Sequence, residues 1–197
     1  MNKTIQDFMQ NYYPDAIEGK TVSGAGSSLM HTGALISELP ILFERFNIQT
    51  LLDAPCGDLF WISCINFGSI FYHGVDIQER VIDRNIKKFP GKAFTCLDIT
   101  EDTLPKADMI FSRDGLVHFS KMHIDATLQN FRDSGAEYLI MTHFTNQREF
   151  VDIETGDWRP INFCLPPFNM EPPVVILNER YKDPAFSDKS VALWRLR

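Results

Sequence analysis

Apolar residues along the chain alternate between short runs of strand length and longer stretches with helical spacing. Short apolar runs predict buried strands at 50–54, 71–77, 93–99, 107–112 and 137–142. Apolar residues at helical spacing predict helices over 29–46, 78–89 and 121–133. Strands that alternate with helices in this way favour a parallel sheet with helices on both faces.

Local signals add detail to these elements. A short helix is expected over 3–13, and the Gly- and Ser-rich stretch TVSGAGSS at 21–28 predicts a loop. Pro40 lies inside a helical stretch, so we expect it to split or kink that helix. A further helix is expected to begin near Leu59. Gly135 is expected to cap the C-terminus of the helix predicted over 121–133.

The pattern changes after Phe144. Residues 145–173 contain five prolines and cannot form a regular crossover helix throughout. Two strand-like runs follow at 174–178 and 191–196, and the connector between them is too short for a crossover helix. We therefore expect these two strands to be antiparallel neighbours in an α/β sheet of seven strands.

Composition and charge narrow the class of protein. The chain has 197 residues, 44% of them apolar, which suits one folded domain and excludes disorder as its main state. Its net charge of -7, with no basic run to offset it, disfavours a nucleic-acid partner. The four cysteines form no CxxC pair, so no metal site is predicted and a reducing compartment is expected. No signal peptide or membrane span is readable, and a soluble cytoplasmic protein is expected.

Acidic residues end three successive predicted strands: Asp53, Asp76 and Asp98. Ligands of open parallel sheets bind beyond the carboxyl ends of the strands, and Gly57 lets the backbone after Asp53 approach one closely. Asp76 is placed to accept hydrogen bonds from ribose hydroxyls, and Asp98 to accept from an exocyclic amine such as that of adenine. The alternative is that each acid only caps a turn or helix; the three together with Gly57 favour nucleoside binding.

Several motifs carry a family resemblance. LLDAPCGD at 51–58 resembles motif I of the class I S-adenosylmethionine-dependent methyltransferases, and GVDI, CLDIT and ADMIFSRDGLVHFS follow in the family's order. The match covers about residues 48–145, and the last two strands fit the family's terminal hairpin. SGAGS and DWRPINFCLPPFNMEPP resemble a bacterial subgroup often associated with surface-glycan or small-metabolite modification.

The resemblance implies a Rossmann-like, seven-stranded methyltransferase sheet in a single domain over 1–197. That domain would comprise N-terminal helices and the Gly/Ser loop (1–47), a cofactor-binding core (48–144), an acceptor-side lid (145–173) and a closing hairpin (174–197). S-adenosylmethionine is the implied cofactor, and S-adenosylhomocysteine is its product. The implied cofactor residues are Asp53, Gly57, Asp58, Asp76, Ile77, Asp98, Ile99, Ser112, Arg113, Gly24, Gly26 and Ser27. For the glycine loop, a plain flexible loop is the alternative.

Methyl transfer to a hydroxyl calls for a base, and Asp114, His118 and His143 all lie at or after strand ends. His118 is four residues after Asp114, so the two could face one another, and a neighbouring carboxylate would fix the His tautomer. The alternative is that His118 packs beneath the next helix and that Asp114 only orients its neighbours. Trp61, Phe144 and Trp194 are expected in the core.

The proline-rich stretch is the expected acceptor-side wall. Trp158, Arg159, Asn162 and Phe168 combine aromatic faces, a guanidinium and an amide, which suit sugars, phosphates or carboxylates. The alternative is a surface lid whose aromatic side chains only bury themselves. The expected reaction is O-methylation of a sugar, sugar nucleotide or phosphate-bearing metabolite, with no sequence signal for the oligomeric state.

Two other functions are weighed against this one. An NAD-dependent oxidoreductase would suit Asp76 equally well, but the GxGxxG turn is absent, since Leu59, Phe60 and Trp61 follow Gly57. A non-catalytic nucleoside-binding subunit on the same fold would bind cofactor without turnover. The acids together with His118 and Arg159 favour an active enzyme.

Overall fold

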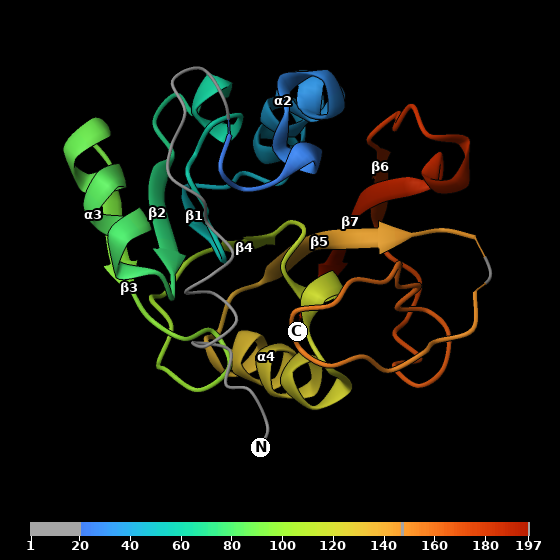
Figure 1. The fold of residues 1–197 in the computed structure, drawn as a ribbon. Helices are drawn as coiled ribbons and strands as arrows, with labels where there is room; N and C mark the ends of the chain where they lie inside the picture. The colour runs from blue at the N-terminus through green and yellow to red at the C-terminus, as the bar shows by residue number, and fades with distance from the viewer. Residues whose placement is uncertain (1–20, 147, 197) are drawn as a thin grey trace.

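The computed structural model describes residues 21–146 and 148–196, and the helix expected over 3–13 lies outside them. Within the described residues the strands are β1 (Thr50–Asp53), β2 (Phe71–Asp76), β3 (Ala93–Cys96), β4 (Met109–Ser112), β5 (Tyr138–Phe144), β6 (Val175–Asn178) and β7 (Lys189–Arg195). They form one sheet in the order β3-β2-β1-β4-β5-β7-β6 (Figure 1). The first five strands are parallel, and β7 runs antiparallel to β6, as the sequence predicts. It also runs antiparallel to β5.

Helices cover both faces of the sheet. The described α-helices are α2 (Leu29–Arg45), α3 (Glu79–Lys88) and α4 (Lys121–Asp133). In Figure 1, α2 lies above the sheet and α4 below it. One apolar cluster joins side chains of α2 and α3, such as Leu39 and Ile82, to the first face. A second cluster joins Leu128 and Phe131 of α4 to the other face, so each face has its own core.

One local expectation is wrong, and a second is contradicted in one of its two alternatives. No helix begins at Leu59: this residue has a left-handed φ of 55°, and only the 3₁₀ turn η2 (Ile62–Cys64) follows. The Asp58 carboxylate accepts a hydrogen bond from the Phe60 amide, which bends the chain locally, and the Leu59 side chain is buried. Pro40 does not split its helix, since α2 continues through it. The expected positions of Trp61, Phe144 and Trp194 in the core are confirmed.

Strand order reverses between β1 and β4, which lie side by side while the chain leads from them to opposite edges. Three short 3₁₀ turns surround the carboxyl ends of these strands: η1 (Ala25–Ser27), η3 (Leu116–His118) and η4 (Pro184–Phe186). This reversal is where open α/β sheets bind their ligands.

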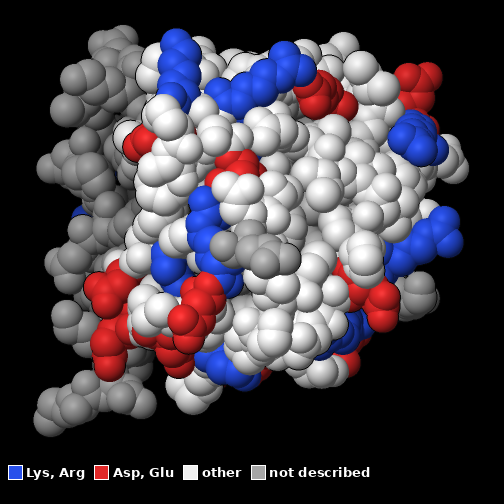
Figure 2. Space-filling model, turned by 90° about the vertical axis from the view of Figure 1, so that its right-hand side faces the viewer, with Lys and Arg blue, Asp and Glu red and all other residues white. Residues whose placement is uncertain are grey.

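The surface carries charges of both signs. Figure 2 shows, on the face to the right of Figure 1, basic and acidic side chains interspersed among uncharged ones. Across the described part of the chain, no helix has the length and apolar character needed to cross a membrane.

Candidate functional site

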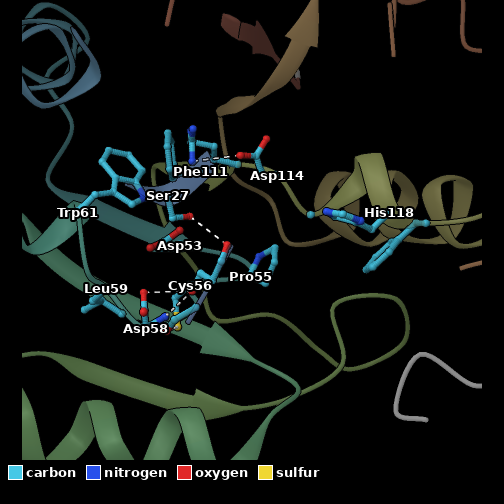
Figure 3. A pocket seen from close by; sticks show the side chains of 15 residues that line it. Ser27, Asp53, Pro55, Cys56, Asp58, Leu59, Trp61, Phe111, Asp114 and His118 are labelled. Atoms are coloured by element: carbon cyan, nitrogen blue, oxygen red, sulfur yellow. Dashed lines mark hydrogen bonds and ion pairs between the residues drawn. The ribbon is translucent and has the colours of Figure 1, made fainter. Parts of the chain in front are cut away.

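Two adjoining cavities open at the carboxyl ends of β1 and β4. The inner cavity is lined by the turn after β1, the turn after β4 and the loop before α2 (Figure 3). The outer cavity, of about 310 Å³, lies between that loop and the C-terminal hairpin. Ser23, Asp114 and His118 line both cavities, so the two meet at these side chains.

The turn after β1 is built on Asp76 at the end of β2. Asp76 is fully buried, and its carboxylate accepts hydrogen bonds from the amides of Gly57 (3.0 Å) and Gln78 (3.0 Å). The Asn85 side chain donates to the Gly57 carbonyl at 2.7 Å, and Gly57 has a φ of 58°. Gly57 lines the inner cavity, whereas Asp76 does not line it and instead holds the turn that contains Gly57.

Asp53, the last residue of β1, lines the inner cavity and is only 3% exposed. Burial raises the pKa of its carboxyl to about 8, against the opposing hydrogen bond that the Tyr72 hydroxyl donates to it. Asp53 is therefore largely protonated and neutral at pH 7. A cation placed in this cavity would favour its ionised form.

Asp58 fastens the loop before α2 to the turn after β1. Its carboxylate accepts hydrogen bonds from the Val22 amide (2.7 Å) and the Ser23 hydroxyl (3.0 Å). Ser27 then lines the inner cavity and Gly24 and Gly26 the outer one. The structure therefore brings the predicted Gly/Ser loop to the site.

Ion pairs hold the turn after β4. Arg113, almost fully buried, donates from Nε and Nη2 to Glu179 at 3.0 and 2.7 Å, and from Nη2 to the Gly26 carbonyl at 2.9 Å. Asp114 contacts Arg113 Nη1 at 3.1 Å and accepts from Lys189 Nζ at 2.7 Å. Although burial opposes ionisation, these two cations hold the pKa of Asp114 well below its usual range.

His118 and His143 lie in different surroundings. His118 lines both cavities, and its Nδ1 lies 2.9 Å from the Asp157 carbonyl. Burial lowers its pKa, so the ring is neutral at pH 7. His143 lies within β5, packs edge-to-face on Trp194 and lines neither cavity; burial lowers its pKa to about 4. Of the three predicted bases, the structure brings together only Asp114 and His118.

Four of the remaining predicted cofactor residues lie outside both cavities. Ser112 ends β4, and its buried hydroxyl has no hydrogen-bond partner among the described residues. Asp98 accepts hydrogen bonds from Thr100 within its own turn, while Ile99 and Ile77 pack against the second apolar cluster. None of these four lines either cavity.

On the acceptor side, Trp158 lines the outer cavity, where it packs edge-to-face on Phe144 and Phe186. The other expected wall residues do not line it. Asn162 donates to the carbonyls of residues 145 and 146, Phe168 packs on Phe163 in the core, and the Arg159 guanidinium donates to backbone carbonyls.

Sequence reasoning missed Glu179, Tyr181 and Lys189. Tyr181 and Lys189 line the outer cavity, and the Glu179 side chain is fully buried against Arg113. Charged residues beside apolar strand runs, as in ILNER and DKSVALW, were the available signal. Among the described residues, no group of three or more His, Cys, Asp or Glu is placed to hold a metal.

No protein-family model matches the chain, and no curated protein matches its sequence. Solved structures do resemble it. Human N-acetylserotonin methyltransferase in complex with S-adenosylmethionine aligns with a TM-score of 0.58 and 12% identity over 97% of this chain and 65% of its own. The N-methyltransferase NodS from Bradyrhizobium japonicum WM9, in complex with S-adenosylhomocysteine, aligns with a TM-score of 0.53 and 13% identity over 71% and 72%.

The chain spans 50%, 58% and 66% of the length of three further solved structures that it matches. At these low identities the likeness establishes the fold and leaves the substrate open. The strand order, the antiparallel hairpin and these neighbours agree. The chain has the fold of the class I S-adenosylmethionine-dependent methyltransferases.

Proposed function

We propose that this protein is an S-adenosylmethionine-dependent methyltransferase that transfers a methyl group to a hydroxyl of a small polar acceptor. The observation that carries the proposal is the meeting of two cavities at Asp114 and His118. One cavity lies at the strand-order reversal where this fold binds its ligands, and the other gives an acceptor access to the same side chains.

The residues around the inner cavity fit the proposed cofactor. Gly57 brings backbone close to the cavity. Ser112 lines neither cavity, so the prediction that it borders the methionine part stays a prediction. Asp53 can ionise beside the ammonium of the methionine part, and Ser27 and Arg113 line the same cavity. The predictions that Asp76 holds the ribose, beside Ile77, and that Asp98 and Ile99 bracket the adenine stay predictions.

When bound, S-adenosylmethionine supplies an electrophilic methyl group on a sulfonium. His118 is the proposed base: burial favours its neutral ring, whose Nε2 would accept the hydroxyl proton of the acceptor while the methyl group would pass from the cofactor's sulfur to that oxygen. Asp114 is a poorer base because its cationic neighbours stabilise its ionised form. We assign it the role of holding the turn after β4. His143 stays a predicted base without a place at either cavity.

The outer cavity supports an acceptor with a ring. Trp158 and Phe186 offer aromatic surface, and aromatic faces stack on sugars. We therefore propose a sugar, sugar nucleotide or related metabolite, as in bacterial glycan or small-metabolite biosynthesis, rather than a nucleic acid. All four cysteines are unpaired, which supports a reducing, cytoplasmic setting.

Calorimetry with S-adenosylmethionine and S-adenosylhomocysteine tests the cofactor assignment. We expect both to bind, and we expect Asp76→Ala to weaken binding because it removes the support of the Gly57 turn. An unchanged dissociation constant in this variant would remove Asp76 from the cofactor site. Failure of both compounds to bind at millimolar concentration, or binding of NADH in their place, would overturn the proposal.

An assay of S-adenosylhomocysteine release across sugars, sugar nucleotides and phosphorylated metabolites tests the reaction. Once an acceptor is found, His118→Ala should lower kcat by roughly 10²–10⁴-fold, the usual contribution of a general base. His143→Gln tests the other predicted base: because His143 lines neither cavity, we expect little change in kcat, and a loss as large as that of His118→Ala would move the role of base to His143. Cofactor binding without release for every acceptor would favour a non-catalytic binding protein.

A further inference from the structure

The segment 155–159 of the proline-rich stretch closes over the η3 turn. The Arg159 guanidinium donates to the Val117 carbonyl at 3.1 Å and to the Phe119 carbonyl at 2.7 Å. The Arg159 backbone amide also donates to the Val117 carbonyl, at 3.1 Å. The two carbonyls flank His118 in sequence, so one side chain fixes the backbone on both sides of the proposed base.

The same segment contacts His118 directly. The Gly156 amide donates to the His118 carbonyl at 2.8 Å, and His118 Nδ1 lies 2.9 Å from the Asp157 carbonyl. A carbonyl oxygen accepts and cannot donate, so Nδ1 carries the hydrogen in this contact. In the neutral ring, the lone pair is then on Nε2.

Arg159 is held by the protein interior. It is 6% exposed, its guanidinium stacks over the Phe150 ring at 4.8 Å, and it lines neither cavity. Within residues 21–146 and 148–196, no carboxylate lies within ion-pair distance of it. A buried cation without a carboxylate in contact costs stability, and here its planar fork joins two carbonyls.

We propose that Arg159 and the Asp157 carbonyl are positioning groups that hold His118 as its Nδ1–H tautomer, with Nε2 as the proton acceptor. The catalytic part of this proposal rests on the proposed function; the positioning part concerns the free protein alone. Arg159, expected from the sequence to touch the acceptor, acts instead through His118. His118 is the catalytic residue, and Arg159 sets its orientation.

Two-bond ¹H–¹⁵N spectra of the histidine rings test the proposal without cofactor or acceptor, because they distinguish the two neutral tautomers. His118→Gln identifies the His118 signals among the five histidines. In the wild-type protein at pH above the His118 pKa, we expect the Nδ1–H pattern. An Nε2–H pattern in the wild type would overturn the proposal by itself, whether or not any variant folds.

Matched variants then separate positioning from general support. Arg159→Gln should lose the Nδ1–H pattern or show both tautomers, and Arg159→Lys should retain it in part. Asp157→Ala should match the wild type, since it keeps the backbone carbonyl. Thr155→Val removes different links from the same segment, the contacts of the Thr155 hydroxyl with the Ser120 amide and with His123 Nδ1. It should lower stability without changing the tautomer of His118.

A folded Arg159→Gln protein that keeps the wild-type pattern would contradict the role of Arg159, as would loss of the pattern in Thr155→Val. Calorimetry with S-adenosylhomocysteine on the same proteins separates this proposal from the proposed function. Arg159 lines neither cavity, so Arg159→Gln should bind with the wild-type affinity. Absence of binding in every protein, with the expected tautomer intact, would overturn the methyltransferase assignment and leave the positioning of His118 standing.

Discussion

The turns after β1 and β2 form the first wall of the site, and the turn after β4 forms the second wall. The two walls hold their carboxylates by different means. After β1 and β2, Asp53, Asp58 and Asp76 are held by backbone amides and hydroxyls. After β4, Asp114 is held by Arg113 and Lys189. Burial raises the pKa of Asp53 in the first wall, so its carboxyl can change its charge, whereas two cations fix the charge of Asp114 in the second. The first wall can therefore respond electrostatically to a ligand, and the second is a fixed framework.

Removing Arg113 should break the second wall and produce the largest effect. Among the described residues, Arg113→Met leaves Lys189 Nζ, 3.5 Å away, as the one cationic partner of the fully buried Glu179 carboxylate. We expect a loss of about 3–5 kcal/mol in the free energy of unfolding, measured by urea titration. Lys121→Met removes an exposed helical pair with Asp125 and should cost less than about 1 kcal/mol.

The double variant Arg113→Met/Glu179→Leu sharpens the interpretation. If the loss comes from an unpaired buried charge, replacing Glu179 should recover part of it. Equal losses in the single and double variants would instead assign the effect to packing, for example of Arg113 over the Trp61 ring.

The raised pKa of Asp53, in the first wall, should make the free energy of unfolding depend on pH. The pKa of Asp53 rises from 3.8 to about 8 on folding, so the folded state keeps its proton where the unfolded state has lost it. Stability from this group is fully present below pH 4 and is lost as pH rises toward 8. The slope approaches about 1.4 kcal/mol per pH unit between these limits.

Asp53→Asn does not titrate and can still accept from Tyr72, so it isolates this effect. Between pH 5 and pH 8, its free energy of unfolding should improve relative to the wild type by at least about 2 kcal/mol. Urea titrations at four pH values measure the difference. A constant difference across this range would show that Asp53 is already ionised in the free protein.

The fold was predictable because it depends on periodicity. All seven strands and the three long helices lie where apolar spacing placed them, since burial of those faces dominates the choice of element. The exceptions lie where local geometry competes with the pattern. Asp58 bends the chain after β1, so Leu59 contributes to the core without a helix.

The site was less predictable, because a side chain's partners come from distant parts of the chain. The sequence placed Asp53, Gly57, Asp114 and His118 at strand ends, and the structure brings them to the cavities. It could not show that Arg159 turns away from the outer cavity toward Val117 and Phe119, 40 or more residues earlier. Nothing in local spacing distinguishes a ligand-binding arginine from one that binds carbonyls.

The two walls are also in van der Waals contact where Gly115 approaches Pro55. A substitution at Gly115 tests how tightly the two walls are packed. A Cβ at this position would lie 2.6 Å from Pro55 Cδ, so Gly115→Ala must push the turns after β1 and β4 apart. We expect a loss of about 1–3 kcal/mol in stability and weaker S-adenosylhomocysteine binding, since both turns line the inner cavity. Gly33→Ala, in a helix with open space around it, should stabilise by about 0.5–1 kcal/mol and leave binding unchanged.

The smallest effect on stability should come from the tether that joins the Gly/Ser loop to the first wall. Asp58→Ala removes the acceptor for the Val22 and Phe60 amides and for the Ser23 hydroxyl, in a partly exposed position, and should cost about 1 kcal/mol. Because the loop lines both cavities, the loss in the free energy of S-adenosylhomocysteine binding should exceed the loss in the free energy of unfolding. Asp108→Ala is the matched control: that carboxylate accepts from two amides at the opposite end of β1, away from both cavities. Similar losses of stability with weaker binding only in Asp58→Ala would establish that the tether shapes the cofactor site; equal binding in both variants would reduce Asp58 to a structural role.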